Sequence, residues 1–337
     1  MLKVGINGFG RIGRTAFKIA LDKFSDRIEI VAVNDLGDAQ TLTHLLKYDS
    51  NYGVWKHEVS STDEYIIVDK KRYKVLNEKD PSNLPWKDLG VDVVIESTGR
   101  FTDKAGAVQH IQAGAKKVII SAPAKGDGAA VNTYLLGVNG DKYSGEEVIS
   151  NSSCTTNCIA PVAKVINERF GILKAMMTTV HAYTQDQNLQ DGPHKDLRRA
   201  RGAAQNIIPT STGAAVSTAH VIPELEGKFD GTSMRVPVPV GSISDFTFLL
   251  SKKVTKDEIN KALKEASEST QYKGILAVTN EPIVSSDIVG RPESAIVDLP
   301  LTQVVDGDLV KIFAWYDNEY GYSNRLIEQV INVGTAA

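Results

Sequence analysis

One heptapeptide suggests nucleophilic chemistry, Ser152-Ser153-Cys154-Thr155-Thr156-Asn157-Cys158. Apolar residues recur after it at roughly helical spacing, which predicts that Cys154 lies in or beside the first turn of a helix. Unpaired N–H groups and the helix dipole at such a position favour the thiolate, the nucleophilic form of cysteine. The alternative is a small buried residue that only packs near the helix start. Cys158, four residues on, is either a packing residue on the same helix face or a redox partner.

His181 is the histidine best placed to activate such a cysteine. It ends a strand predicted over residues 174–180, in a segment that would return near the Cys154 helix. Within hydrogen-bond reach of the sulfur, its ring could hold a thiolate–imidazolium pair and later act as acid or base. A hydrogen-bonded structural histidine is the alternative, and His194 and His220 are the competing candidates for a base.

Groups suited to binding a dianion accompany this pair. Hydroxyls, a glycine N–H and guanidinium groups are what phosphate oxygens need, because arginine presents paired donors in a fixed geometry. The arginines near position 199 could instead form a solvated helical face or a contact between subunits. The candidates are Ser153, Thr155, Thr184, Arg199, Thr212, Gly213 and Arg235.

A glycine-rich motif near the N-terminus predicts a dinucleotide site, Gly8-Phe9-Gly10-Arg11-Ile12-Gly13. It follows a predicted strand and opens a predicted helix, and Asp35 ends the next strand 22 residues after Gly13. The glycines permit a tight turn and the close approach of a pyrophosphate to the helix N-terminus. Asp35 would accept hydrogen bonds from ribose hydroxyls and would repel a 2′-phosphate, so NAD is favoured over NADP.

Two further residues could contact this cofactor. Ser121 closes a predicted strand, where it could line the cofactor groove at the carboxyl edge of the sheet or serve only as a strand cap. Asn318 could hydrogen-bond the nicotinamide carboxamide, although an asparagine beside aromatic residues and glycine is also typical of a turn.

The first third of the chain alternates β-branched runs with amphipathic segments, which predicts a doubly wound parallel sheet of the Rossmann type. Shorter runs between residues 55 and 76 indicate a small antiparallel addition. The predicted strands cover residues 2–7, 28–34, 91–96 and 118–121, and the predicted helices cover 11–23, 39–46 and 104–113.

Longer apolar runs with few helices between them follow, which predicts an α+β second domain with a mainly antiparallel or mixed sheet. Residues 182–211 carry Gly, Pro and many charges without a period, and a loop of that length is usually functional. The strands predicted here cover residues 174–180, 232–240, 242–250, 275–278, 296–298 and 310–315, and a last helix covers 324–332.

Composition and charge exclude some classes of function. The 337 residues are 42% hydrophobic and 23% charged, an ordinary globular composition, and their number predicts two domains. A net charge of −3 gives no basic field for nucleic acid or an anionic membrane as a main partner. Two cysteines without nearby histidine ligands predict no disulfide framework and no metal site. Since the chain opens directly on a predicted strand and has no long apolar run, we expect a cytoplasmic protein.

Taken together, these stretches make the chain very similar to the phosphorylating glyceraldehyde-3-phosphate dehydrogenases of the NAD-dependent type. The similarity covers essentially the whole chain and includes the segment Ser153-Cys154-Thr155-Thr156-Asn157-Cys158. Its other motifs lie at residues 4–14, 44–50, 96–101, 121–123, 181–184, 193–201 and 315–319.

The resemblance implies a nucleotide-binding (Rossmann) domain over residues 1–151, joined by a C-terminal helix over 318–337, and a catalytic domain over 152–317. It makes Cys154 the nucleophile and His181 its activator, and it places the two phosphate sites on the dianion-binding candidates above. Lys79 is the least secure cofactor contact, because the family often has arginine there. The implied cofactor contacts are Arg11, Ile12, Asp35, Lys79, Ser121 and Asn318.

The implied reaction is the reversible oxidative phosphorylation of D-glyceraldehyde 3-phosphate to 1,3-bisphosphoglycerate with NAD and inorganic phosphate, in glycolysis or gluconeogenesis. Cys154 would carry a hemithioacetal and then a thioester, from which phosphate releases an acyl phosphate. The alternatives are an erythrose-4-phosphate dehydrogenase or an NADPH-preferring biosynthetic relative. Intact Cys154, His181 and Arg235 argue against a non-catalytic scaffold. Members of the family are typically cytosolic homotetramers, in which the loop over residues 182–211 packs against a neighbouring subunit and its cofactor.

The chain departs from the commonest pattern of that family at several positions. Ser152 replaces a usual alanine, Gly192 replaces a common leucine, and Tyr320 stands where tryptophan or threonine is frequent. Residues 238–245 are unlike the usual Thr-x-Asn-Val-Ser-Val-Val-Asp. Gly192 bears on the choice of cofactor, and Pro193 together with Asp35 keeps NAD ahead of NADP.

Overall fold

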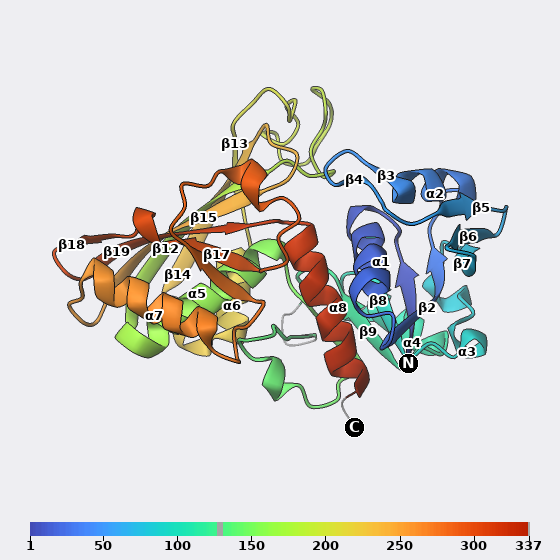
Figure 1. The fold of residues 1–337 in the computed structure, drawn as a ribbon, viewed down its shortest axis with the longest axis horizontal. Coiled ribbons are helices and arrows are strands. Elements are labelled where there is room, and N and C mark those ends of the chain that lie inside the picture. Colours follow the sequence, from blue (N-terminus) through green and yellow to red (C-terminus); the bar gives the residue numbers. More distant parts are fainter. Residues whose placement is uncertain (127–130, 336–337) are drawn as a thin grey trace. The chain divides into compact units, whose positions relative to one another are not determined.

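The structure is a computed structural model that describes residues 1–126 and 131–335 (Figure 1). The chain forms two compact units. Unit 1 comprises Met1–Tyr134, Lys142–Ser152 and Ser323–Ala337, and unit 2 comprises Leu135–Asp141 and Ser153–Tyr322. These bounds differ from the predicted 1–151, 152–317 and 318–337, because Leu135 and Val138 pack into the hydrophobic core of unit 2.

Unit 1 contains a nine-stranded sheet whose strand order is β10-β11-β9-β8-β1-β2-β7-β6-β5. The neighbours from β10 to β7 are parallel, whereas β6 and β5 are added antiparallel at one edge. The doubly wound sheet and its antiparallel addition are therefore confirmed. The strands are β1 (Leu2–Asn7), β2 (Ile28–Asn34), β5 (Val59–Ser61), β6 (Tyr65–Val68), β7 (Lys71–Leu76), β8 (Val93–Glu96), β9 (Lys117–Ile120), β10 (Asn132–Thr133) and β11 (Val148–Ser150). The helices are α1 (Arg11–Lys23), α2 (Ala39–Lys47), α3 (Trp86–Leu89), α4 (Lys104–Gln112) and most of α8 (Tyr320–Thr335), and β3 (Tyr48–Asp49) pairs with β4 (Gly53–Val54).

A buried polar network ties together the carboxyl ends of β1 and β8. The Glu96 carboxylate accepts hydrogen bonds from Asn7 Nδ2 at 2.6 Å, His110 Nε2 at 3.0 Å and the Thr98 N–H at 2.8 Å. Trp86 Nε1 donates to His110 Nδ1 at 3.0 Å, which assigns the proton of a neutral ring to Nε2. The network fixes the two loops that follow β1 and β8, where the strand order of the sheet reverses.

Unit 2 contains an eight-stranded mixed sheet with the order β13-β14-β12-β15-β19-β17-β16, and β18 pairs with β19. The central strand β12 runs parallel to β14 and antiparallel to β15, so the predicted α+β domain with a mixed sheet is confirmed. The strands are β12 (Ile172–Ala182), β13 (Ile208–Ser211), β14 (Phe229–Val236), β15 (Ser242–Leu250), β16 (Leu276–Thr279), β17 (Ala295–Asp298), β18 (Gln303–Val305) and β19 (Leu309–Tyr316). The helices are α5 (Cys154–Phe170), α6 (Ala214–Val221) and α7 (Lys256–Glu268).

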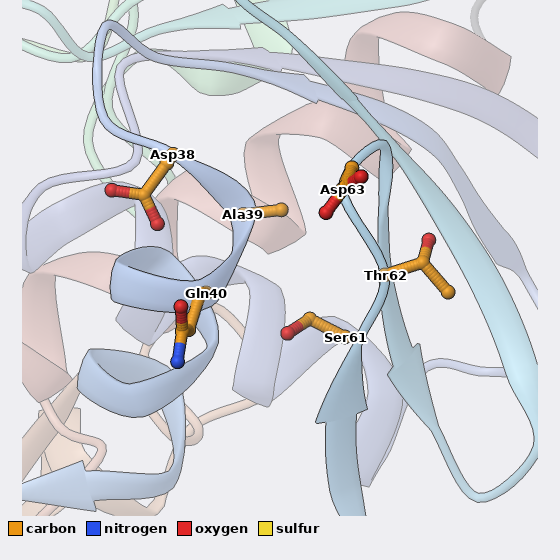
Figure 2. Close-up of a pocket in the computed structure, with 6 residues that line it drawn as sticks. All are labelled: Asp38, Ala39, Gln40, Ser61, Thr62 and Asp63. Atoms are coloured by element: carbon orange, nitrogen blue, oxygen red, sulfur yellow. The ribbon is translucent and has the colours of Figure 1, made fainter.

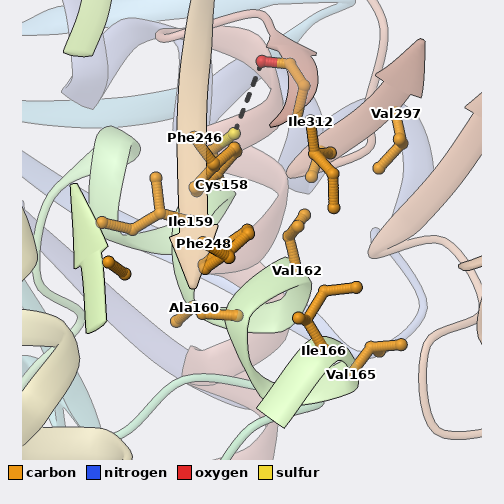
Figure 3. Packing of buried hydrophobic residues seen from close by; sticks show 14 of the residues in the cluster. Cys158, Ile159, Ala160, Val162, Val165, Ile166, Phe246, Phe248, Val297 and Ile312 are labelled. Carbon is orange, nitrogen blue, oxygen red and sulfur yellow. Dashed lines mark hydrogen bonds between the residues drawn. The ribbon is translucent and has the colours of Figure 1, made fainter. Parts of the chain in front are cut away.

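The core of unit 2 lies between α5 and the sheet (Figure 3). Side chains of α5 such as Ile159 and Ile166 share this core with Phe246 and Phe248 of β15, and all four are completely buried. Each such side chain contributes about 1.5–3 kcal/mol through removal from water. Cys158 lies in the same core with its Sγ 3.8 Å from the Ala314 carbonyl oxygen, so it packs there as a small apolar residue.

Some elements differ from the sequence prediction. The strand predicted over 232–240 ends at Val236, because Pro237 and Pro239 cannot donate to a ladder. The segment 182–211 ends in a strand, β13, which pairs with β14. The last helix begins at Tyr320 rather than at 324. Across residues 1–126 and 131–335, no helix combines the length and the apolar character needed to cross a membrane.

The capping box of α7 gives a test of local stability. Thr255 Oγ1 accepts from the Glu258 N–H at 3.3 Å, and the Glu258 carboxylate accepts from the Thr255 N–H at 2.7 Å. We predict that Thr255→Ala lowers the free energy of unfolding by about 1 kcal/mol in urea denaturation. Ser267→Ala on the same helix is the control and should change it by less than about 0.5 kcal/mol. Equal losses in the two variants would contradict the capping role.

Candidate active site

Cys154 is the first residue of α5, as predicted. Ser153 is the N-cap, and its Oγ accepts from the Thr156 N–H at 3.0 Å. Just before it, Ser152 has a φ of +54°, in the left-handed region that residues other than glycine seldom adopt. This turn separates β11 from α5 within three residues, 151–153, and leaves the Cys154 side chain half-buried at the helix start.

The His181 ring faces this sulfur. Cys154 Sγ lies 3.4 Å from His181 Nε2, and His181 lies next to the end of β12. His181 Nδ1 lies 2.7 Å from the Ala182 carbonyl oxygen, a contact that assigns the proton of the neutral ring to Nδ1. The lone pair of Nε2 therefore points at the thiol, in the arrangement of a nucleophile and its base.

Arg235 brings a positive charge to the same pair. Because β12 and β14 are parallel and in register, Arg235 stands beside His181 although 54 residues separate them. Arg235 Nη1 donates to the Ala182 carbonyl oxygen at 3.0 Å and to Thr184 Oγ1 at 3.2 Å. The structure thus brings together four of the predicted residues, Cys154, His181, Thr184 and Arg235.

The pKa directions at this pair differ from the expectation of a thiolate. Burial raises the pKa of the Cys154 thiol above its ordinary value, whereas Arg235 and the Thr155 N–H lower it. Burial, followed by Arg235, lowers the pKa of His181 to about 3. These directions favour a neutral thiol beside a neutral imidazole. The expected ion pair differs from that state by one proton, which would move from Sγ to Nε2 over 3.4 Å.

Tyr316 supports the pair and was not predicted from the sequence. Its hydroxyl lies 2.9 Å from Thr155 Oγ1 and 2.8 Å from Thr179 Oγ1, and its ring packs edge-on against His181. It faces inward on β19, as do Ala314 and Ile312. Period-two alternation along that strand was the available signal, but it could not distinguish a supporting residue from core.

Arg199 belongs to the loop before β13, and its side chain contacts the last residues of that strand. Its Nε donates to Thr210 Oγ1 at 2.9 Å and its Nη2 to the Ser211 carbonyl oxygen at 3.2 Å, while its Nη1 binds the Asp186 carboxylate. Burial raises the pKa of Asp186, but the hydrogen bond and the charge of Arg199 outweigh burial and hold the pKa below its ordinary value. Arg199 also contributes to lowering the pKa of His181, which places the two in electrostatic range.

The other dianion-binding candidates lie at helix starts. Ser153 Oγ lies 2.8 Å from Thr156 Oγ1 at the start of α5, where Thr155 contacts Tyr316. Thr212 Oγ1 accepts from the Ala214 N–H at 3.2 Å, and Gly213 is the N-cap of α6, which packs against α5. A side chain at Gly213 would meet no atom within 4 Å, so the backbone there is open to a ligand.

The competing histidines have other surroundings. His194 Nδ1 accepts from the Asp196 N–H at 2.9 Å, and its Nε2 lies 3.6 Å from the Asp186 carboxylate. His220 is exposed in the last turn of α6. The base candidate that the structure places beside Cys154 is therefore His181.

In unit 1 the glycine-rich loop has the geometry of a pyrophosphate cradle. Gly8 has a φ of +92°, and a Cβ at Gly13 would lie 2.1 Å from the Gly8 carbonyl oxygen, so neither tolerates a side chain. A Cβ at Gly10 would meet nothing within 4 Å, and Gly10 is the N-cap of α1. An anion can therefore approach the backbone at the helix N-terminus.

The remaining cofactor candidates surround the carboxyl ends of the strands in unit 1. Asp35 follows β2 and accepts from the Phe9 N–H at 2.7 Å and the Gly37 N–H at 3.0 Å. Arg11 Nη1 binds the Asp49 carboxylate at 2.8 Å, while the backbone of Arg11 lies at the first position of α1. The others are the half-buried Ile12 in α1, the exposed Lys79 after β7, and the half-buried Ser121 after β9, whose N–H donates to the Glu96 carbonyl oxygen.

A pocket of about 470 Å³ lies between the start of α2 and the turn after β5 (Figure 2). Asp38, Ala39 and Gln40 line one side of it, and Ser61, Thr62 and Asp63 line the other. None of these residues belongs to the site described above. In the described parts of the chain, no group of three His, Cys, Asp or Glu side chains is arranged to hold a metal ion.

The doubly wound sheet of unit 1 and the thiol beside an imidazole in unit 2 fit the class of dinucleotide-dependent oxidoreductases. Comparisons with known families agree. Residues 2–104 match the family described as the NAD binding domain of glyceraldehyde 3-phosphate dehydrogenase, and residues 153–318 match its C-terminal domain. The chain therefore belongs to the glyceraldehyde-3-phosphate dehydrogenase family.

Individual relatives are similar over nearly their full length. The chain is 59% identical to glyceraldehyde-3-phosphate dehydrogenase of Streptomyces coelicolor over 335 residues, 99% of this chain and 98% of the relative. It is 57% identical to that of Borreliella burgdorferi, over 97% of this chain and 98% of the relative. It is 56% identical to that of Geobacillus stearothermophilus, over 97% of this chain and 96% of the relative. The erythrose-4-phosphate and NADPH-preferring alternatives are not favoured by these comparisons.

The effect of Arg235 on the thiol can be measured. We predict that Arg235→Gln moves the alkaline rise in the rate of Cys154 alkylation by iodoacetamide to higher pH by about one pH unit, because a positive charge that lowers the thiol pKa is lost. Mass spectrometry would identify the labelled cysteine. Arg201→Gln, at an exposed arginine paired with Asp191, is the control and should leave the profile unchanged. A profile that stays in place or moves to lower pH in Arg235→Gln would contradict this role.

Proposed function

We propose that the chain catalyses the reversible oxidation of D-glyceraldehyde 3-phosphate, with NAD and inorganic phosphate, to 1,3-bisphosphoglycerate. The observation that carries the proposal is the 3.4 Å contact between Cys154 Sγ and His181 Nε2. Arg235 donates a hydrogen bond to the carbonyl oxygen of Ala182, the residue after His181. A thiol beside a base is what covalent capture of an aldehyde needs. Nearby guanidinium groups suit a phosphorylated substrate. The full-length similarity to enzymes of that name supports the same reaction.

In the proposed mechanism, Cys154 Sγ bonds to the aldehyde carbon while His181 Nε2 takes the thiol proton. The proton passes to the former carbonyl oxygen and gives a hemithioacetal. His181 then removes that hydroxyl proton as hydride leaves the carbon, so that a thioester remains on Cys154. A phosphate oxygen attacks the thioester carbonyl, the C–S bond breaks, and the acyl phosphate is released. Cys154 leaves as a thiolate, which then regains the proton held by His181. The two phosphate groups would be bound by the dianion-binding candidates, which are Ser153, Thr155, Thr184, Arg199, Thr212, Gly213 and Arg235.

NAD supplies the acceptor for the hydride when it is bound. The open backbone at Gly10 and the bonded carboxylate of Asp35 suit the pyrophosphate and the ribose hydroxyls. Further contacts to NAD in unit 1 would come from Arg11, Ile12, Lys79 and Ser121. Asn318 would bind the nicotinamide carboxamide. Asp35 favours NAD, because its charge would repel a 2′-phosphate.

We also propose a cytoplasmic homotetramer. The segment from 182 to 211 exposes three large apolar side chains, with exposed fractions of 75% at Leu189, 80% at Leu197 and 71% at Ile207. Three such side chains on one long loop favour a contact with another subunit, as the resemblance to the family implies.

The central experiment measures NADH formation from glyceraldehyde 3-phosphate with and without inorganic phosphate. We expect sustained turnover only with phosphate, because water is a poor substitute at the thioester. Cys154→Ser should abolish oxidation and leave NAD affinity nearly unchanged, whereas the matched control Cys158→Ala should remain active. Turnover that is independent of phosphate, or full activity in Cys154→Ser, would refute the proposal.

Cofactor choice gives a separate prediction. Asp35→Ala should reduce the ratio of kcat/KM for NAD to that for NADP by about tenfold, because charge-assisted bonds to the ribose and the repulsion of a 2′-phosphate are both lost. Asp38→Ala, at the N-cap of α2 three residues on, is the matched control and should keep the ratio. A ratio that stays the same in both variants would remove Asp35 from the choice of cofactor.

A further inference from the structure

The amide of Asn318 is held in one orientation by two donors. Its Oδ1 accepts from the Gly241 N–H at 3.0 Å and lies 3.2 Å from Ser242 Oγ. Asn318 is 5% exposed, and within residues 1–126 and 131–335 no hydrogen bond uses its Nδ2. An asparagine amide offers one accepting end and one donating end. With Oδ1 engaged, Nδ2 is the end that remains to donate to a ligand.

Ser242 connects this amide to the strand that carries the base. Its Oγ accepts from the Ala182 N–H at 3.1 Å, and Ala182 follows His181 directly. A hydroxyl has a single proton, so the proton of Ser242 is free to point at Asn318 Oδ1. The result is a buried chain of two hydrogen bonds, in which the Ala182 N–H donates to Ser242 Oγ and Ser242 Oγ donates to Asn318 Oδ1. Ser242 is only 1% exposed.

The surrounding backbone leaves little freedom to this chain. Ser242 begins β15, which lies between β12 and β19 and therefore reaches both Ala182 and the residues after Tyr316. Gly241 has a φ of +96°, and a Cβ there would lie 2.6 Å from the Ser285 carbonyl oxygen, so this turn requires glycine.

The turn that carries Asn318 is equally fixed. The Asp317 carboxylate accepts from the N–H groups of Gly290 at 2.8 Å, Glu319 at 2.9 Å and Tyr320 at 2.8 Å. With both backbones held, the rotation of the Asn318 amide is the freedom that remains. The Ser242 hydroxyl and the Gly241 N–H together oppose that rotation.

We propose that Ser242 is a positioning residue for the nicotinamide, which it serves by holding Asn318 with Nδ2 toward the carboxamide oxygen of the ligand. The inference rests on the proposed role of Asn318 in binding NAD. It assigns a direction to that bond, in which the protein donates and the ligand accepts. It also links the nicotinamide contact to the backbone beside His181 through one hydroxyl.

Ser242→Ala tests this assignment without touching the ligand. The variant removes one of the two donors to Oδ1 and leaves the Ala182 N–H without its acceptor, so that the Gly241 N–H alone holds the amide. We expect the Kd for NAD, measured by isothermal titration calorimetry, to rise about fivefold. The Kd for ADP-ribose, which lacks the nicotinamide ring, should stay within about twofold of wild type.

A matched control and a second ligand sharpen the test. Ser244 lies two residues on, on the same buried face of β15, and its Oγ is hydrogen-bonded neither to Asn318 nor to Ala182, so Ser244→Ala should bind NAD like wild type. The acetylpyridine analogue of NAD keeps the carbonyl oxygen but lacks the amide nitrogen. Ser242→Ala should weaken its binding by the same factor as that of NAD.

Three outcomes would overturn the inference. Unchanged NAD affinity in Ser242→Ala would show that the hydroxyl positions nothing. An equal loss for ADP-ribose would indicate a general structural defect. A loss for NAD but not for the acetylpyridine analogue would mean that Asn318 accepts from the ligand through Oδ1. Each result is read from binding, so it stands apart from the phosphate-dependent turnover of the wild-type chain that tests the proposed function.

Discussion

The chemistry of this chain depends on one contact, in which Cys154 Sγ and His181 Nε2 approach to 3.4 Å. The sulfur is fixed because α5 begins at Cys154, with Ser153 as its cap. The ring is fixed because Nδ1 faces the Ala182 carbonyl oxygen and Tyr316 packs against its edge. A helix start and a strand end must therefore meet within a fraction of an ångström, and the core between α5 and the sheet provides that accuracy. Movement of either element would separate the thiol from its base.

Much of the fold could be predicted because local rules determine it. The bounds of β1, α1, β2 and β15 agree with the predicted residues, since each has a clear apolar period bounded by glycine, proline or a polar turn. The tight turn at the glycines of the first loop could also be predicted, because Gly8 and Gly13 occupy positions that leave no room for a side chain. Residues whose requirement is local, such as a tight turn or a helix cap, leave a local trace in the sequence.

The supporting contacts could not be predicted, since they join residues far apart in the chain. Tyr316 reaches Thr155 across 161 positions, and Ser242 reaches Asn318 across 76. Nothing in the period of β15 or β19 distinguishes these side chains from core residues that face the same way. The direction of the Cys154 pKa was also missed, because the helix start was visible in the sequence whereas the extent of burial was not. Burial depends on packing from several elements at once.

The Arg199–Asp186 pair gives the proposed phosphate-binding region a counter-ion that belongs to the protein itself. An anion that bound Arg199 would compete with this carboxylate for the guanidinium group, and a dianion would compete better than a singly charged ion. The same carboxylate is ready to return when a phosphorylated product moves away. At the proposed phosphate site, the charge of Asp186 would therefore favour doubly charged ligands over singly charged ones.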